Sequence, residues 1–309
     1  MDYYQSNMPD GSSQNSSQDH TLVEVINEVN SDPIIRQRLM RRLVEKTGRH
    51  VISYVSSNAP LPQAFINDWD AEIIENILKS YGSKFEKIDL ILHSGGGFAE
   101  SAERIVNSMY SYCKDFRVII PTQAKSAATI VAMGSSKILM SDTSEIGSID
   151  PQLPNGIAAQ SVIKAYEELM QTIEEKQQDG KPYEAELVLI NKIDPVLLRE
   201  CRKYMDLAQD IASKLLNKKM RSKRNPINVD EIGMNFLDDS RTFSHGRLIG
   251  WEAAKDLGLK IKYIDKNDEI WKLVWEIYIR SKIAIERSML AKIIEDQNNS
   301  LNPGQLPVR

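Results

Sequence analysis

Four short apolar segments, each followed by a stretch of helical pattern, constrain the fold of this chain more than any other feature. They are residues 50–55 (HVISYV), 88–93 (IDLILH), 116–121 (FRVIIP) and 137–140 (KILM). Apolar runs with few polar alternations are typical of strands covered on both faces. Apolar residues at helical spacing lie between them, at 70–81, 99–112 and 125–135. This order predicts an α/β fold of βαβ units, with functional residues at the carboxyl ends of the strands.

Further helices are expected on both sides of this region. One helix is predicted from residue 33 to the break at Gly48, and residues 157–220 are mostly helical in pattern. A last strand is predicted at 260–264 and one long helix at 268–296. The apolar stripe of that helix would pack on its own domain or mediate self-association, and the pattern leaves both open. The stripe contains Ile270, Trp271, Val274, Trp275, Ile277 and Tyr278.

The domain organisation follows from where apolar residues are found. Residues 1–20 contain no Leu, Ile or Val, so we expect a disordered tail there. Residues 21–267 are expected to form one domain, and residues 268–309 a C-terminal helical extension and tail.

Composition argues against two classes of partner. The chain has 39 Lys and Arg against 43 Asp and Glu, a net charge of −4, so it lacks the positive excess that nucleic-acid binding requires. The most apolar stretch near the middle, residues 127–133, is far shorter than the roughly 20 residues of a transmembrane helix. We therefore expect no integral membrane segment and, without a secretory signal, a cytoplasmic protein.

Three segments that follow predicted strands could carry chemistry. Residues 93–97 (HSGGG) would let the backbone approach another group closely. Residues 123–129 (QAKSAAT) place Ser126 at a strand-to-helix junction, where a serine is either a nucleophile or a helix cap. Residues 144–153 (SEIGSIDPQL) form a turn-rich loop without a histidine.

In order and spacing these segments resemble the Clp protease/crotonase superfamily, and more closely the serine dehydrogenase proteinase family, a relative of signal peptide peptidase A. The matching residues are 90–105, 118–140 and 144–153, with weaker similarity at 41–55 and 245–259. The resemblance implies a Clp protease/crotonase-like fold of repeated ββα and βαβ units with a helical C-terminal part.

The resemblance also implies a function and its residues. It implies a serine endopeptidase that hydrolyses peptide bonds through an acyl-enzyme on Ser126, with Lys164 as the base of a Ser-Lys dyad. Backbone N–H groups of Gly96 and Ala127 would form the oxyanion hole, and Gly97 would belong to the same substrate-binding loop. Asp150 replaces the histidine of Clp-type proteases. This chemistry requires no metal and no cofactor, the substrate would be a peptide or protein, and a homo-oligomer is expected.

Two departures from the family pattern keep other functions open. Ser126-Ala127-Ala128 replaces the usual Ser-Gly-Gly, and Gly95-Gly96-Gly97 replaces Pro-Gly-Gly. One alternative is a catalytically weak scaffold that binds peptides or a partner protein through the same groove. Another is acyl-CoA chemistry as in crotonases, where paired N–H groups hold a thioester enolate and no nucleophile such as Ser126 is needed.

Overall fold

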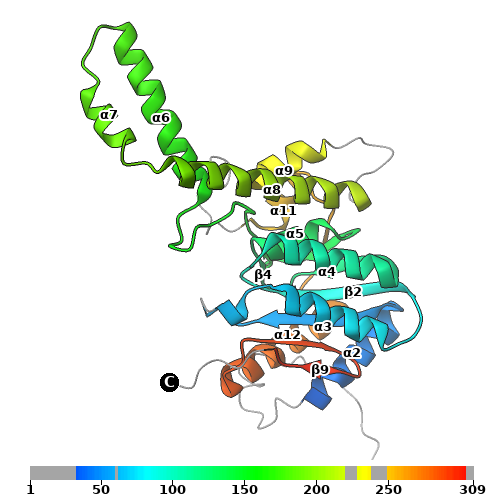
Figure 1. Ribbon diagram of the computed structural model, residues 1–309. Coiled ribbons are helices and arrows are strands. Elements are labelled where there is room, and N and C mark those ends of the chain that lie inside the picture. Colours follow the sequence, from blue (N-terminus) through cyan, green and yellow to red (C-terminus); the bar gives the residue numbers. More distant parts are fainter. Residues whose placement is uncertain (1–32, 60–61, 220–227, 238–248, 304–309) are drawn as a thin grey trace, which may run out of the picture.

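A seven-stranded sheet forms the centre of the computed structural model, which describes residues 33–59, 62–219, 228–237 and 249–303 (Figure 1). The strand order is β7-β5-β3-β2-β1-β8-β9. Five strands are parallel, namely β1 (His50–Ser56), β2 (Phe85–His93), β3 (Cys113–Ile119), β5 (Ile138–Met140) and β7 (Ile261–Tyr263). β8 (Lys292–Asp296) joins β1 in the antiparallel direction, and β9 (Ser300–Leu301) pairs antiparallel with β8. The predicted α/β fold with a mostly parallel sheet is confirmed.

Helices cover both faces of the sheet. One layer contains α3 (Asp68–Lys79), α4 (Ala99–Tyr112) and α5 (Ala127–Met133), with the short 3-10 turn η1 (Pro62–Ala64) before α3. The other layer contains α2 (Pro33–Thr47) and α12 (Glu269–Ser288). Adjacent residues of one strand pack into opposite layers, because side chains alternate along a strand. Leu90 of β2 belongs to the first core and Ile91 to the second.

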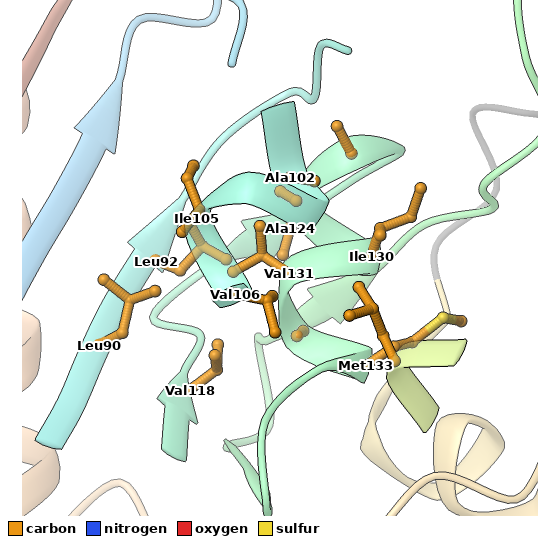
Figure 2. Close-up of a cluster of buried hydrophobic side chains, with 14 of the residues drawn as sticks. Leu90, Leu92, Ala102, Ile105, Val106, Val118, Ala124, Ile130, Val131 and Met133 are labelled. Atoms are coloured by element: carbon orange, nitrogen blue, oxygen red, sulfur yellow. The ribbon is translucent and has the colours of Figure 1, made fainter. Parts of the chain in front are cut away.

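The core beneath α4 and α5 supports the edge of the sheet at which the candidate segments lie. Figure 2 shows Leu90 and Leu92 of β2 together with side chains of α4 and α5. The two helices approach closely, since a methyl group at Gly134 would lie 2.6 Å from Val106 of α4. Every residue of α5 is buried, so the start of this helix is held firmly by packing.

The second half of the chain adds a helical arm. Its helices are α6 (Ala159–Gln178), α7 (Glu184–Ile190), α8 (Pro195–Lys219), α9 (Val229–Leu237) and α11 (Trp251–Asp256). α8 adds Ala208, Ile211 and Leu215 to the main core. Residues 159–190, called the projecting hairpin below, extend away from the sheet (Figure 1). α6 buries only Ala159 and Ile173, and α7 buries no residue.

The long C-terminal helix predicted over 268–296 is wrong in its last part. α12 ends at Ser288, Met289 adopts a left-handed conformation, and Lys292–Asp296 form a strand of the main sheet. Lys292, Glu295 and Asp296 are buried in this strand against partners from elsewhere in the chain.

The apolar stripe of α12 packs on the chain's own core. Trp271, Val274 and Ile277 are buried in a cluster with α2 and the sheet, which leaves little of the stripe for self-association. The expected tail at residues 1–20 lies outside the described residues, and the proposed domain boundaries stay predictions.

One of the buried acids of β8 makes stability depend on pH. Burial works to raise the pKa of Asp296, but the His50 ring, whose Nε2 lies 3.4 Å from Oδ2, and hydrogen bonds from Tyr81 and the backbone of Asn298 and Asn299 prevail and hold the pKa at about 2. Tyr81 donates to this carboxylate at 2.7 Å. A carboxylate whose pKa is lowered in the folded state stabilises the protein above its unfolded pKa, and this stabilisation is lost as the pH falls through the folded pKa.

Asp296→Asn should therefore reduce the free energy of unfolding at pH 7 by about 2 kcal/mol. The difference between variant and wild type should shrink between pH 4 and pH 2, as the wild-type carboxylate becomes protonated. Urea denaturation of the wild type and the variant at pH 7, 4 and 2.5 measures this difference in the free energy of unfolding and its dependence on pH. A difference that is the same at all three pH values would contradict the role given to Asp296.

Candidate active site

The three segments that the sequence singled out lie together at the carboxyl edge of β2. Ser94, directly after β2, forms a parallel bridge with Ala124 of β4 (Gln123–Ala124). The N–H of Ser94 donates to Gln123 O, and that of Lys125 to Ser94 O, both at 3.1 Å. On its other side β4 pairs with β6 (Glu145–Ile146). β4 is therefore the element that joins the glycine-rich loop to the loop at 144–153.

Ser126 has an unusual backbone conformation. Its φ is 50° and its ψ is −120°, the angles of the first central residue of a type II′ turn, which favours glycine. Among the described residues it is one of two non-glycine residues with positive φ, the other being Met289. The N–H of Ser126 donates to Ser148 O at 3.0 Å. Although Ser126 occupies the N-cap position of α5, its side chain makes no capping hydrogen bond, so the helix-cap interpretation is wrong.

The backbone of the glycine-rich loop lies directly against this serine. Gly96 has a φ of 113°, and a methyl group there would lie 2.6 Å from the Cβ of Ser126 and 3.2 Å from its Oγ. The same methyl group would be 2.8 Å from the carbonyl oxygen of Lys125. Gly97 has a φ of 155°, and a side chain there would overlap the backbone of Ile66. Both positions therefore require glycine.

The backbone N–H groups around Ser126 differ in their partners. The N–H of Gly96, which we expected to be an oxyanion donor, donates to the hydroxyl of Ser94 at 3.1 Å. Within the described part of the chain, the N–H groups of Gly97 and Ala127 have no hydrogen-bond partner. Two N–H donors near the serine are thus available to a ligand. One of them, Gly97, lies one residue after Gly96, the donor expected from the sequence.

Lys164 lies in the second turn of α6 and is half-buried. The start of this helix is fixed to the loop at 144–153, because the N–H of Ala159 donates to Pro151 O at 2.8 Å. At 1.5 Å per residue, Lys164 is roughly 8 Å along the helix axis from Ala159, and Lys176 is a further 18 Å or so. Of these two lysines, Lys164 is therefore the nearer to the anchored end of α6, whereas Lys176 lies beside α7 and pairs with Glu186 at 2.8 Å.

Asp150 lies where the resemblance places the histidine of Clp-type proteases. It is 2% exposed and accepts a hydrogen bond from the hydroxyl of Ser148, whose backbone oxygen in turn accepts from Ser126. The loop therefore puts a buried acid, and no histidine, close to the serine.

Neither described histidine hydrogen-bonds to Ser126. His93 lies 2.6 Å from the hydroxyl of Thr122 and 3.2 Å from Asn58 Oδ1. Burial, with a contribution from Lys282, lowers the pKa of His93 to about 3. His50 begins β1 and so lies at the opposite edge of the parallel sheet. His20 and His245 lie outside the described residues.

Sequence reasoning missed one segment of the site. The N–H of Ile66 donates to Gly96 O at 2.8 Å, and the N–H of Phe98 donates to Ile66 O at 3.0 Å. Residues 65–67 thus pair with the glycine-rich loop beyond the point at which Ser94 pairs with β4. The one visible signal was the N-terminal pattern of α3, in which Asn67 and Asp70 form a capping box. That pattern marks a helix start and says nothing of the loop.

No described helix is both long and apolar enough to cross a membrane. The described residues also include no group of three His, Cys, Asp or Glu side chains that could hold a metal ion.

Comparison with known proteins gives both relatives and similar structures. An uncharacterized protein of Methanocaldococcus jannaschii is 27% identical over 253 residues, 79% of each chain. Another from that organism is 29% identical over 137 residues, 42% of this chain and 46% of the relative. ClpP1 from Listeria monocytogenes aligns with a TM-score of 0.42 and 12% identity, over 76% of this chain and 99% of ClpP1. A mutant of that ClpP1 gives a TM-score of 0.43 and 12% identity, over 75% and 99%.

A family profile matches most of the chain, and not only the short segments of the candidate site. The profile described as ClpP-like SDH-type serine proteinase matches residues 25–290. This range contains the glycine-rich loop, Ser126, the loop at 144–153 and the five parallel strands. The chain therefore belongs to the family of ClpP-like SDH-type serine proteinases.

Proposed function

We propose that the protein is a serine endopeptidase whose Ser126 attacks the carbonyl carbon of a peptide bond. The observation that carries this proposal is the conformation of Ser126, a strained residue between a strand and a helix with Gly96 packed against its side chain. Such strain costs about 1–3 kcal/mol and persists where the surrounding structure enforces it, often at active sites. The turn resembles the nucleophile elbow, which exposes a serine hydroxyl to substrate.

Lys164 is proposed as the general base. As a neutral amine it would accept the proton of Ser126 Oγ during attack and deliver it to the nitrogen of the leaving peptide. A water molecule would then attack the acyl-enzyme, with Lys164 again taking the proton and returning it to Ser126. The hydrogen bond that fixes the start of α6 at Pro151 supports Lys164 over Lys176, because Lys164 lies nearer that end of the helix.

The oxyanion of the tetrahedral intermediate would be bound by the N–H groups of Gly97 and Ala127. Donors of this kind stabilise the charge that develops on the carbonyl oxygen. Gly97 takes the role that we expected for Gly96, because the N–H of Gly96 is used by Ser94. Gly96 would instead hold the loop against Ser126 through its backbone.

The nucleophile and its base can be tested by covalent labelling. Purified wild-type protein should gain the mass of one fluorophosphonate adduct, and Ser126→Ala should gain none. Lys164→Met should slow labelling by about 10²–10⁴-fold, the usual contribution of a general base. The rate of the wild type should rise with pH as the amine loses its proton.

Ser136→Ala and Lys176→Met are the matched controls, and both should label at the wild-type rate. An unlabelled wild type would instead favour the catalytically weak scaffold. Binding to immobilised coenzyme A by an unlabelled wild type would favour acyl-CoA chemistry.

The glycine-rich loop can be tested through the close contact at Gly96. Gly96→Ala should slow labelling of Ser126 by about 10²–10³-fold, the effect of losing an oxyanion donor, because the methyl group displaces the loop. Gly82→Ala is the control: its φ is +66° but nothing lies within 4 Å of the added methyl group. Equal labelling rates in the two variants would show that the loop does not position the oxyanion hole.

A homo-oligomer with peptide or protein substrates is the proposed working form. The projecting hairpin and the start of α8 expose Leu187, Val188, Leu189, Val196 and Leu197. Val188 and Val196 are 59% and 66% exposed, and apolar side chains gathered on so poorly buried an element are typical of an interface. We propose that a second copy of the chain covers them.

Size-exclusion chromatography with light scattering should give a mass of two or more times 35.1 kDa. Val188→Glu should shift the protein to the monomer without unfolding it, because an interface would have to bury the new carboxylate unpaired. Lys181→Glu, on the turn between α6 and α7, is the control for a change of charge alone. A wild-type mass of 35.1 kDa at micromolar concentration would refute the oligomer.

A further inference from the structure

A buried ion pair lies at the carboxyl end of β1, on the edge of the sheet that carries the candidate site. Lys292 of β8 is 1% exposed and pairs in register with Ser56, the last residue of β1. Its Nζ donates to the two carboxylate oxygens of Asp70 at 3.0 and 2.8 Å and to Phe65 O at 2.6 Å. All three protons of the ammonium group therefore have an acceptor.

Asp70 connects this lysine to the start of α3. Its Oδ2 also accepts from the Tyr54 hydroxyl at 2.9 Å and from the N–H of Asn67 at 3.0 Å. The second of these bonds belongs to the capping box that begins α3. One fully buried carboxylate thus links strand β1, strand β8 and the chain immediately before α3.

Residues 65–67, held in this way, form one wall of the glycine-rich loop. Lys292 holds the carbonyl of Phe65, and Asp70 holds the N–H of Asn67. Ile66, between them, exchanges backbone hydrogen bonds with Gly96 O and the N–H of Phe98. Because Gly97 fits against Ile66 without room for a side chain, a displacement of Ile66 would displace the loop.

We propose that Lys292 and Asp70 are positioning residues for the oxyanion hole, acting through residues 65–67 on the glycine-rich loop. This inference rests on the proposed serine peptidase function. Lys292 lies beyond residues 25–290, which the family profile matches, so membership of the family gives it no role. A buried ion pair adds little stability relative to apolar side chains of similar volume, but its directional hydrogen bonds fix the atoms that they join.

The same strand provides a matched control. Glu295 is buried and paired with Arg36 of α2, whose Nε and Nη2 donate to its carboxylate at 2.7 and 3.1 Å. This pair has no hydrogen bond to residues 65–67 or to the glycine-rich loop. Arg36→Met and Lys292→Met each leave one buried carboxylate without its cation, so the two variants should be destabilised by a similar mechanism.

The experiment compares full-length wild type, Lys292→Met, Asp70→Asn and Arg36→Met. The first measurement is the second-order rate constant for fluorophosphonate labelling of Ser126. The second is hydrogen–deuterium exchange of peptides covering residues 64–67 and 95–99. Denaturation in urea shows which variants are folded, and if Lys292→Met does not fold, the isosteric Asp70→Asn variant decides.

Lys292→Met and Asp70→Asn should slow labelling by about 10–100-fold, the effect of misplacing a catalytic group by about 1 Å. Both should raise exchange in the two peptides at least tenfold, whereas Arg36→Met should change neither quantity more than twofold. Equal effects of Arg36→Met and Lys292→Met would overturn the proposal. An unlabelled wild type would refute the peptidase function, and the exchange measurement would still decide whether the ion pair holds the loop.

Discussion

The contact between the Gly96 backbone and Ser126 is the constraint on which the rest of the site depends. It requires a glycine with positive φ on one side and a serine with positive φ on the other. Glycine adopts this conformation readily, whereas in serine it is strained. Three neighbouring segments hold the two together. β4 fixes the chain before Ser126, Ser148 accepts from the Ser126 N–H, and Ile66 pairs with the glycine-rich loop. The strain at the serine is thus maintained by backbone hydrogen bonds that the sheet edge supplies.

The sheet itself accounts for where these segments meet. β2 and β3 are adjacent and parallel, so the loops that follow them leave from the same edge. α4 and α5 then pack on the same face, over the core of Figure 2. The first residues of α5 are held by that packing, which is why a short helix can carry a strained residue at its N-terminus.

Much of this could be predicted from the sequence, since the relevant signals are local. Apolar runs such as 88–93 marked the buried strands, and the spacing of HSGGG and AKSAA marked two loops at one edge. The strand at 292–296 could not be predicted in the same way, because the opposite charges that pair with Lys292 and Glu295 in the interior, Asp70 and Arg36, are more than 200 residues away in the sequence. The sequence could not show that the N–H of Gly96 has a partner whereas that of Gly97 does not, because the direction of a backbone N–H depends on dihedral angles that three successive glycines leave undetermined.

The buried charges also tie the C-terminal strand to the rest of the fold. β8 adds an antiparallel strand beside β1 and brings Lys292 to the edge that carries Ser126. The charged residues of this strand are therefore part of the interior, where each one fixes a neighbouring segment through hydrogen bonds.

The central claim is that Ser126 is a nucleophile facing two backbone donors. A crystal structure of the full chain with a peptide boronate tests it most directly, because boron forms a tetrahedral adduct that imitates the intermediate. We expect a bond between boron and Ser126 Oγ, with a boronate oxygen within hydrogen-bond distance of the N–H groups of Gly97 and Ala127. A boronate bound without a bond to Ser126, or an adduct whose oxygen points away from both donors, would contradict it.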